Sequence, residues 1–150
     1  MNASAQIRKY RNTDKQAVLD LLRLNTPAAF APEEEKELVH YLEHELEHYF
    51  VITVNDQVVG CGGFNFAGDK TTGRISWDML HPAYHGQSLG SRLLNYRIGK
   101  LKEFPELEKI IVRTSQLAYR FYEKNGFRLL QVEKNYWAMG YDLYLMEYKQ

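Results

Sequence analysis

Hydrophobic residues along the chain follow two different periods, and the changes of period divide the sequence into helices and strands. Four stretches repeat apolar residues at the spacing of an amphipathic helix: residues 14–24, 32–48, 89–101 and 115–125. Six shorter runs are rich in β-branched and aromatic residues, as strands are: residues 49–54, 58–64, 73–80, 109–113, 127–132 and 142–148. The sequence therefore predicts the element order ααβββαβαββ.

Turn and capping residues mark several boundaries of these elements. Thr13 precedes the first helical stretch and is its expected N-cap. Pro32, followed by three glutamates, suits the first turn of the second helix, because carboxylates are stabilised at the positive end of a helix dipole. Asn55 and Asp56 predict a hairpin turn, and Gly126 suits the left-handed position that closes a helix.

The order of the elements indicates an α/β (α+β) fold in a single domain, residues 1–150. Strands joined by short turns at both ends of the chain should pair antiparallel. The helix 89–101 lies between strands 73–80 and 109–113, and this crossover should pair them in parallel. We therefore expect a mixed, mostly antiparallel sheet of six to seven strands with helices on both faces.

The composition excludes several classes of function. The chain contains 19 Lys and Arg and 19 Asp and Glu, and this net charge of zero argues against nucleic acid as a partner. A lone Cys61 cannot form an internal disulfide, so we expect a buried thiol in a reducing compartment. The chain has no apolar signal segment and no run of about 20 apolar residues, so we expect a cytoplasmic protein without a membrane partner.

The charges are nevertheless distributed unevenly along the chain. Residues 31–48 contain seven Glu and one Lys, whereas residues 85–128 contain nine Lys or Arg and four Glu. A basic segment favours an anionic ligand, and an acidic segment favours a cationic one. The two segments thus favour ligands of opposite charge.

A glycine-containing loop that leads directly into a helix is the most informative segment. It lies in LHPAYHGQSLGSRLL, residues 80–94, and contains Gly86 and Gly90. Backbone N–H groups converge at such a helix end and can bind phosphate, and glycine lets the backbone approach the ligand closely. The glycines alone fit an ordinary strand-to-helix turn equally well, since neither the P-loop nor the dinucleotide fingerprint is present.

A second segment, TSQLAYRFYEKNGFRLL at residues 114–130, places Tyr122 on a helix ahead of a Gly-Phe pair. Together the two segments strongly resemble the GNAT superfamily of N-acetyltransferases. The family motif (Q/R)-x-x-G-x-(G/A) falls on residues 85–90, and N-x-x-A-x-x-x-Y followed by Gly-Phe falls on residues 115–127. The closing pattern at residues 136–146 and the element order also match, so the resemblance spans nearly the whole chain.

The resemblance implies that acetyl-CoA is the cosubstrate, bound at its pantetheine arm and pyrophosphate by the first motif, and we expect no metal. Carried over by position, the residues that would bind it are Met79, Leu80, His85, Gly86, Gln87, Ser88, Leu89, Gly90, Ser91 and Ser115. Three of them depart from the family pattern, with His85 in place of Gln or Arg, Ser88 in place of the first glycine and Ser115 in place of Asn.

The resemblance also implies direct attack of a primary amine on the thioester in a ternary complex, without a covalent enzyme intermediate. The amine must be neutral, the carbonyl oxygen must be polarised, and the leaving thiolate must be protonated. By motif, Tyr122 is the general acid near the sulfur; the alternative is a packed tyrosine, one of eleven. A backbone amide at Met79 or Leu80 would polarise the carbonyl.

The resemblance leaves the general base open. The family member with a glutamate on this strand aligns it near Arg74, which cannot accept a proton. Asp78 and His81 lie at the end of the same strand and are candidate bases. A water chain, or the neutral fraction of the amine itself, is the alternative. Asp142 is a further candidate for holding the amine.

The acceptor, a small-molecule amine or a peptide amine, has no recognisable motif in the sequence. In this architecture the two N-terminal helices and the late hairpin would line its side of the site. The departures at His85 and Ser88 motivate a second hypothesis, a non-catalytic acyl-CoA-binding sensor or partner module of the same fold. The chain is also compatible with a homodimer.

A third hypothesis is a zinc hydrolase. The segment His44-Glu45-Leu46-Glu47-His48 matches H-E-x-x-H, which on one helix can bind zinc with Glu45 as the base. The histidines lie about 200° around the helix from the leucines of the same stretch, so the alternative is a solvated helix face.

Overall fold

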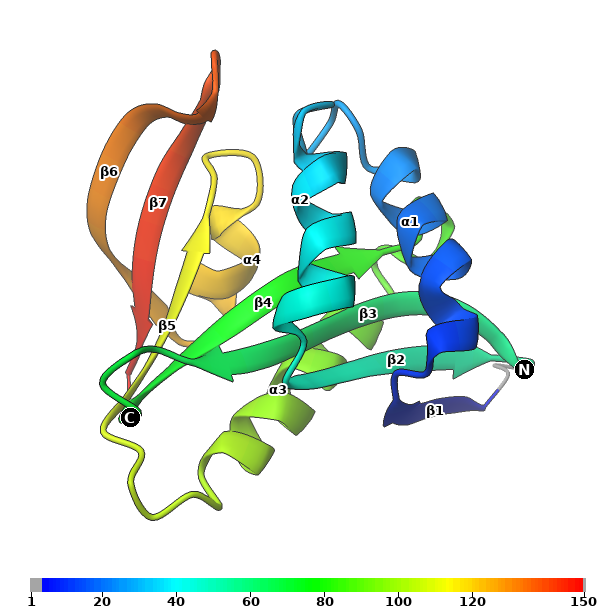
Figure 1. The fold of residues 1–150 in the computed structure, drawn as a ribbon, viewed down its shortest axis with the longest axis horizontal. Helices are drawn as coiled ribbons and strands as arrows, with labels where there is room; N and C mark the ends of the chain where they lie inside the picture. The colour runs from blue at the N-terminus through cyan, green and yellow to red at the C-terminus, as the bar shows by residue number, and fades with distance from the viewer. Residues whose placement is uncertain (1–3, 150) are drawn as a thin grey trace.

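The computed structural model describes residues 4–149 and contains one seven-stranded sheet with helices on both faces (Figure 1). The strands are β1 (Ala5–Lys9), β2 (His48–Val54), β3 (Gln57–Phe66), β4 (Thr72–Leu80), β5 (Lys109–Thr114), β6 (Phe127–Ala138) and β7 (Tyr141–Tyr148). The helices are α1 (Lys15–Leu24), α2 (Glu34–His40), α3 (Leu89–Leu101) and α4 (Tyr119–Lys124). The strand order β1-β2-β3-β4-β5-β7-β6, with a single parallel pair, confirms the predicted mixed, mostly antiparallel sheet.

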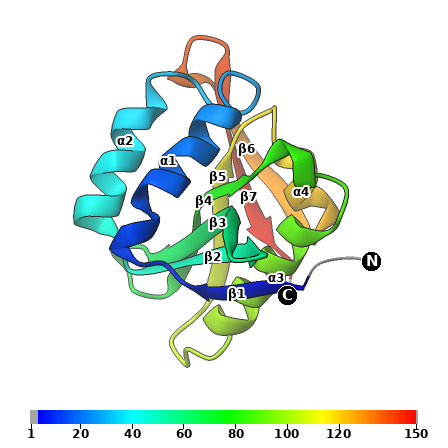
Figure 2. The same cartoon turned by 90° about the vertical axis from the view of Figure 1, so that its right-hand side faces the viewer.

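The two faces of the sheet are covered by different helices, as predicted (Figure 2). On one face α1 and α2 pack on the sheet, and the buried core there includes Leu22, Leu38 and Val51. On the other face α3 packs on the sheet, and the core includes Leu94 and Phe64. Within residues 4–149, no helix is both long and apolar enough to cross a membrane.

The parallel pair β4–β5 joins the two parts of the sheet and is short. Its pairing runs only from Thr72 with Lys109 to Ile75 with Val112. Beyond this point the strands diverge (Figure 1), because β4 continues beside β3 while β5 continues beside β7. The second half of β4 therefore has an edge that is not paired to β5, and the cavity described below opens there.

The start of the chain differs from the prediction. β1 was not predicted; it is short and half-exposed, and its antiparallel pairing with β2 holds it in the sheet. A 3-10 turn, Asn12–Asp14, precedes α1, so Thr13 is not the N-cap. Instead the Asp14 carboxylate accepts a hydrogen bond from the Arg11 N–H at 2.8 Å and pairs with the Arg8 guanidinium.

The second helix is shorter than the predicted stretch 32–48. After α2 the chain makes one π-helical turn, Tyr41–Glu45, and becomes extended at Leu46. His48 is the first residue of β2, where its ring stacks on Phe64 with 4.6 Å between centroids. Leu46 continues the apolar spacing of the helix, but the chain leaves the helix before it because the following residues pair with β3.

The C-terminal elements also have corrected boundaries. Residues 115–118 form a turn rather than the first turn of α4, and the Ser115 hydroxyl accepts a hydrogen bond from the Leu117 N–H at 3.2 Å. Gly126 follows α4 with a φ of +97°, as predicted for the residue that closes this helix. β6 continues to Ala138, beyond its predicted end, because its hairpin with β7 is longer than expected.

Candidate functional site

A cavity of about 980 Å³ opens where β4 and β5 separate. Its wall is formed by β4, the β4–α3 loop (residues 81–88), the start of α3, the end of β5, α4 and the region around α2. Of the residues predicted from the sequence, it is lined by Asp78, Met79, Leu80, His85, Gly86, Ser88, Gly90, Ser91, Ser115 and Tyr122. The separation of one parallel pair thus brings both family motifs to a single site.

The remaining candidates lie outside this wall, namely His81, Gln87, Leu89 and Asp142. The His81 ring nitrogen Nδ1 accepts a hydrogen bond from the Ala83 N–H at 3.0 Å and so caps the turn that follows β4. Leu89 is buried and Gln87 is exposed. The Asp142 carboxylate accepts a hydrogen bond from the Asn135 N–H at 2.9 Å within the β6–β7 hairpin. His81 and Asp142 thus both bind backbone of their own segments.

The β4–α3 loop ends in unusual backbone conformations. Gly86 and Ser88 have φ values of +84° and +63°, and for a serine this left-handed conformation costs about 1 kcal/mol. The first intrahelical bond of α3 runs from the Arg92 N–H to the Ser88 carbonyl, so the N–H groups of residues 89–91 have no helical partner. A Cβ on Gly90 would lie 3.3 Å from the Phe121 ring, which explains the glycine at this contact with α4.

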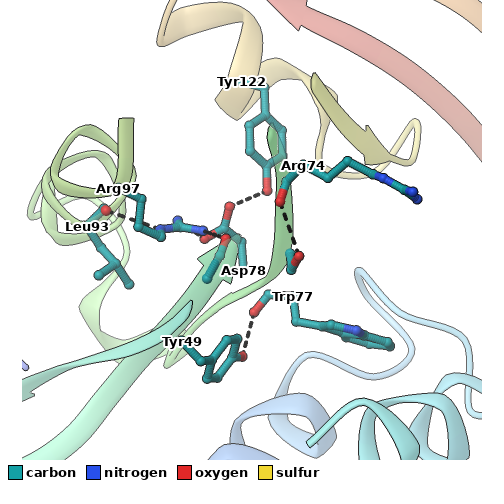
Figure 3. Close-up of polar contacts among 9 residues, drawn as sticks. Tyr49, Arg74, Trp77, Asp78, Leu93, Arg97 and Tyr122 are labelled. Carbon is teal, nitrogen blue, oxygen red and sulfur yellow. Dashed lines mark hydrogen bonds and ion pairs between the residues drawn. The ribbon is translucent and has the colours of Figure 1, made fainter. Parts of the chain in front are cut away.

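Asp78, Arg97 and Tyr122 form a network at the inner end of the cavity, in which Arg97 and Tyr122 are buried and Asp78 is partly buried (Figure 3). The Tyr122 hydroxyl donates to one carboxylate oxygen of Asp78 at 2.6 Å, and the Arg97 guanidinium pairs with the other oxygen. Arg97 is 0% exposed, and it also donates from Nη1 to the Gly63 carbonyl at 3.0 Å and from Nε to the Leu93 carbonyl at 3.2 Å.

Burial changes the acidity of the groups around this network. Desolvation and the Asp78 carboxylate raise the pKa of Tyr122 well above its usual value of 10.0, so the hydroxyl keeps its proton at neutral pH. Desolvation also raises the pKa of Tyr49, whose hydroxyl donates to the Trp77 carbonyl at 2.8 Å. The predicted buried thiol of Cys61 has its pKa raised to about 12 by the same cause.

A β-bulge in β4 directs Asp78 into the network. Cys61 and Gly63 of β3 pair with Met79 and Ser76 of β4, so β4 contains one more residue than β3 across this step. Trp77 occupies the bulge with a φ of +48° and packs in the core on the α1–α2 face. The next side chain, Asp78, points to the opposite face toward α3 (Figure 3).

Arg97 is not among the residues predicted from the sequence, although two signals pointed to it. Arg97 lies four residues from both Leu93 and Leu101 on the apolar face of α3, and a charge at such a position needs a buried partner. Gly62 lies inside a strand, where glycine often marks a close approach. A Cβ on Gly62 would lie 2.4 Å from the Asp78 carboxylate, so the glycine provides the room for the ion pair.

The cavity wall also includes aromatic and acidic side chains from the region around α2 and from the β6–β7 hairpin. They include Phe30 before α2, Tyr41 after α2, Trp137 of β6 and the glutamates Glu34, Glu45 and Glu47. The Tyr141 hydroxyl donates to the Pro27 carbonyl at 3.1 Å and joins the β6–β7 hairpin to the α1–α2 connection. The connection between the two N-terminal helices and the late hairpin are therefore in contact beside the cavity, and their predicted role in lining the amine side stays a prediction.

Glu34 has the most perturbed carboxyl group of this side. Its side chain is buried at the start of α2, where one oxygen accepts a hydrogen bond from the Ala31 N–H at 2.8 Å. Desolvation raises the pKa of Glu34 to about 7, against a usual value of 4.5, because this single hydrogen bond only partly replaces water.

Arg74, which stands near the family's glutamate position, and the H-E-x-x-H segment do not form a further site. Arg74 lines the cavity, but its side chain points away from Asp78 and Tyr122 (Figure 3). His44 lies in the exposed π-helical turn whereas His48 lies in β2, so H-E-x-x-H does not place two imidazoles on one helix. In the part of the chain that the structure describes, no group of three or more His, Cys, Asp or Glu could hold a metal.

Comparisons with known proteins agree with this fold. A model of the acetyltransferase (GNAT) family matches residues 15–127. A relative from Sulfurisphaera tokodaii, an N-alpha-acetyltransferase, is 29% identical over 157 residues, which cover 94% of this chain and 90% of the relative. The chain therefore belongs to the acetyltransferase (GNAT) family of N-acetyltransferases and is an acyltransferase enzyme, as the resemblance predicted.

Solved structures have the same fold. The structure of Ard1 from Thermoplasma volcanium superposes with a TM-score of 0.80 at 19% identity and covers 97% of this chain and 99% of that one. An aminoglycoside 6'-N-acetyltransferase complexed with coenzyme A superposes with a TM-score of 0.76 at 18% identity and covers 95% of both chains. These likenesses confirm the GNAT fold.

Proposed function

We propose that this enzyme transfers the acetyl group of acetyl-CoA to a primary amine by direct attack within a ternary complex. The observation that carries the proposal is the cavity, which brings together the start of α3, the open edge of β4 and the Tyr122 hydroxyl. Family membership and the coenzyme A complex of a protein with the same fold support acetyl-CoA as the cosubstrate.

In this proposal the pyrophosphate binds at residues 85–91 through main-chain N–H groups. The first turn of α3 supplies N–H groups without helical partners, and the helix dipole favours an anion there. The side chains of His85, Ser88 and Ser91 face the same cavity and can add hydrogen bonds. The Ser115 hydroxyl already accepts a bond from its own turn, so it contributes less.

The open edge of β4 favours Leu80 over Met79 as the residue whose amide polarises the thioester carbonyl. The Leu80 carbonyl accepts a hydrogen bond from the Asn25 side chain at 3.1 Å rather than from β3. The N–H and C=O of one residue point to the same side of a strand, so the Leu80 amide also faces away from β3. An amide on that side is available to stabilise the oxygen as it gains negative charge.

Tyr122 is the proposed general acid that protonates the leaving thiolate. It lines the cavity, and its hydroxyl keeps its proton at neutral pH because burial and Asp78 raise its pKa. A buried, protonated hydroxyl is the form that a general acid requires.

The acceptor in this proposal is cationic in solution and binds on the acidic side of the cavity. Glu34, Glu45 and Glu47 line that side, and such charges attract ammonium groups. The names of similar proteins support two acceptor classes, peptide α-amines for the N-alpha-acetyltransferase and small polyamino sugars for the aminoglycoside enzyme.

Two measurements test the proposal. Millimolar acetyl-CoA should raise the melting temperature by mass action. Release of the CoA thiol should then be followed with a panel of polyamines, aminoglycosides, amino acids and peptides with free N-termini. A protein that shows no shift with acetyl-CoA or CoA, or that releases no thiol with any amine of the panel, contradicts the proposal.

A further inference from the structure

The arrangement of the network suggests how a proton moves through the site. We propose that Asp78 and Tyr122 act as one proton-transfer pair, in which Asp78 accepts the proton lost by the acceptor nitrogen while Tyr122 donates its own proton to the departing sulfur. Arg97 is the positioning residue that holds Asp78 in its ionised form. This inference rests on the acetyl transfer proposed above and assigns the base that the sequence left open.

Arg97 determines the charge of Asp78. Two of its bonds go to the neutral carbonyls of Gly63 and Leu93, which offset none of the guanidinium charge. Among residues 4–149, Asp78 is the acidic side chain within ion-pair distance of Arg97. A buried guanidinium without a counter-charge is strongly disfavoured, so the ion pair favours a carboxylate at Asp78 before and after the step, and this form accepts hydrogen bonds and donates none.

Tyr122 must then be the donor in its bond to Asp78. If Tyr122 lost its proton alone, two negatively charged oxygens would lie 2.6 Å apart at a buried position. This repulsion is one of the reasons that the pKa of Tyr122 is raised. Tyr122 can therefore protonate the sulfur readily only when Asp78 is neutralised in the same step.

The proposed step balances in atoms and electrons. As the nitrogen–carbon bond forms, and the carbon–sulfur bond breaks with its electron pair left on sulfur, Asp78 takes one proton from nitrogen and Tyr122 gives one proton to sulfur. Asp78 then returns its proton to the Tyr122 oxygen across their 2.6 Å hydrogen bond. Both side chains recover their starting forms, and the net change is the transfer of one proton from nitrogen to sulfur.

Several other titratable groups lie around this pair and on the cavity wall. Tyr49 of β2 and Cys61 of β3 interact with Asp78, and Tyr41 lies on the α2 side; burial raises the pKa of all three. The other acidic groups and histidines on the cavity wall are Glu34, His44, Glu45, Glu47 and His85. Because these groups shape any pH–rate profile, the sharper test compares variants at a single pH.

The first experiment is a double-mutant cycle at pH 8, measured as thiol release from acetyl-CoA with an accepted amine. Asp78→Asn and Tyr122→Phe should each lower kcat about 100-fold and leave the KM for acetyl-CoA within about threefold. The double variant should be about as slow as the slower single variant, because either change stops the same step. Losses that multiply to about 10,000-fold, or a wild-type kcat in Asp78→Asn, would overturn the inference.

The second experiment needs no substrate. The absorbance of tyrosinate is followed with pH in wild type and Asp78→Asn, each with and without Tyr122→Phe, so that the difference isolates one of eleven tyrosines. Removing the carboxylate should lower the pH at which Tyr122 ionises by about one unit or more. An unchanged ionisation of Tyr122 in Asp78→Asn would show that the Asp78 carboxylate does not hold the Tyr122 proton, which would overturn the inference.

Two further variants serve as a control and as a replacement for Asp78→Asn. Asp56→Asn alters the same residue type in an exposed turn, at a φ of +64° that Asn readily adopts, and should keep the wild-type kcat. If Asp78→Asn does not fold, Arg97→Lys replaces it, because Lys keeps the charge but loses the planar fork that orients Asp78. Its kcat should fall about 10-fold at unchanged KM, and an unchanged kcat would overturn the inference.

The outcomes separate this inference from the proposed function. A wild-type protein that binds no acetyl-CoA overturns the proposed function. Normal turnover in the wild type, with independent effects of Asp78 and Tyr122 in the cycle, overturns only the proton-transfer pair.

Discussion

The β4–α3 loop and the network face the same cavity but are built from different atoms. The loop and the helix start offer main-chain N–H groups from consecutive residues. The network consists of side chains from β4, α3 and α4, and Asp78 lies 19 residues from Arg97 and 44 residues from Tyr122. A main-chain site tolerates substitution of its side chains, whereas a side-chain network depends on each member, and the following variants test this difference.

The largest effect is expected from Tyr122→Phe, which removes one hydroxyl of the network. We expect kcat to fall about 100-fold, because the leaving thiolate loses its acid, while the acetyl-CoA-induced shift in melting temperature stays unchanged. Steady-state thiol release and thermal unfolding measure the two quantities. Tyr96→Phe, on α3 and outside the cavity wall, is the matched control. Equal losses of kcat and of acetyl-CoA binding would contradict the assigned role.

Gly62→Ala tests the room for the ion pair without changing any network residue. The added Cβ would lie 2.4 Å from the Asp78 oxygen and 2.7 Å from the Arg97 guanidinium. We expect a loss of about 1–3 kcal/mol in the free energy of unfolding and a lower kcat, because the pair must shift. Gly99→Ala in α3 is the control, since its Cβ meets open space and should stabilise the helix by about 0.5–1 kcal/mol. A neutral Gly62→Ala would show that the pair can move freely.

Glu34→Gln tests the burial of the acceptor side through pH. The folded protein holds the Glu34 proton up to a pKa of about 7, whereas the unfolded chain releases it near 4.5, so this carboxyl lowers stability as pH rises through that interval. Glutamine keeps an oxygen for the Ala31 N–H and carries no charge. Urea unfolding should show little difference at pH 5 and a gain of about 1–2 kcal/mol for the variant at pH 8, allowing for the cavity's access to water.

The neighbouring carboxyl provides the control for this pH dependence. Glu35 pairs with Arg23, which lowers the pKa of Glu35. Its stabilising effect is therefore present above the unfolded pKa and is lost as pH falls, so Glu35→Gln should give no gain at pH 8. A gain in Glu35→Gln equal to that in Glu34→Gln would mean that general charge repulsion in the acidic segment, and not burial, is the cause.

The smallest effect is expected from Ser88→Gly in the loop. Glycine adopts the φ of +63° without strain, so the variant should be about 0.5–1 kcal/mol more stable. The amide is retained, and the acetyl-CoA-induced thermal shift should be unchanged. Ser91→Gly, inside the first turn of α3, should instead lose about 0.5–1 kcal/mol. Loss of the acetyl-CoA shift in Ser88→Gly would show that the serine hydroxyl, and not the main chain, binds the cosubstrate.

The difference between a contiguous loop and a network of distant side chains also explains what could be predicted from the sequence. The loop and its helix are contiguous, and their glycines and apolar spacing are visible in fifteen consecutive residues, 80–94. Tyr122 was found because it lies in a second contiguous motif. Arg97 was missed because its place on an apolar helix face indicates only that it needs a buried partner. That the partner is Asp78, and that Gly62 leaves room for the pair, follows only once strands and helices are placed together.

The errors in the fold have the same origin. β1 has no continuous apolar run, and it becomes a strand because β2 offers backbone partners from residue 50 to residue 54. The segment 32–48 has the apolar spacing of a helix throughout, but its last residue, His48, pairs with β3 and belongs to the sheet. Both outcomes are decided by hydrogen bonds between segments distant in the sequence, which local periodicity does not report.

The short β4–β5 pairing also bears on how the two parts of the sheet are held together. Four residue pairs are the strand-to-strand link between β1–β4 and β5–β7. A cosubstrate bound between the diverging ends would contact both parts of the sheet and stabilise their packing against each other. Amide hydrogen exchange in β5 and α4 should then slow when acetyl-CoA is added. The cosubstrate would thus stabilise the sheet of the enzyme as well as take part in its reaction.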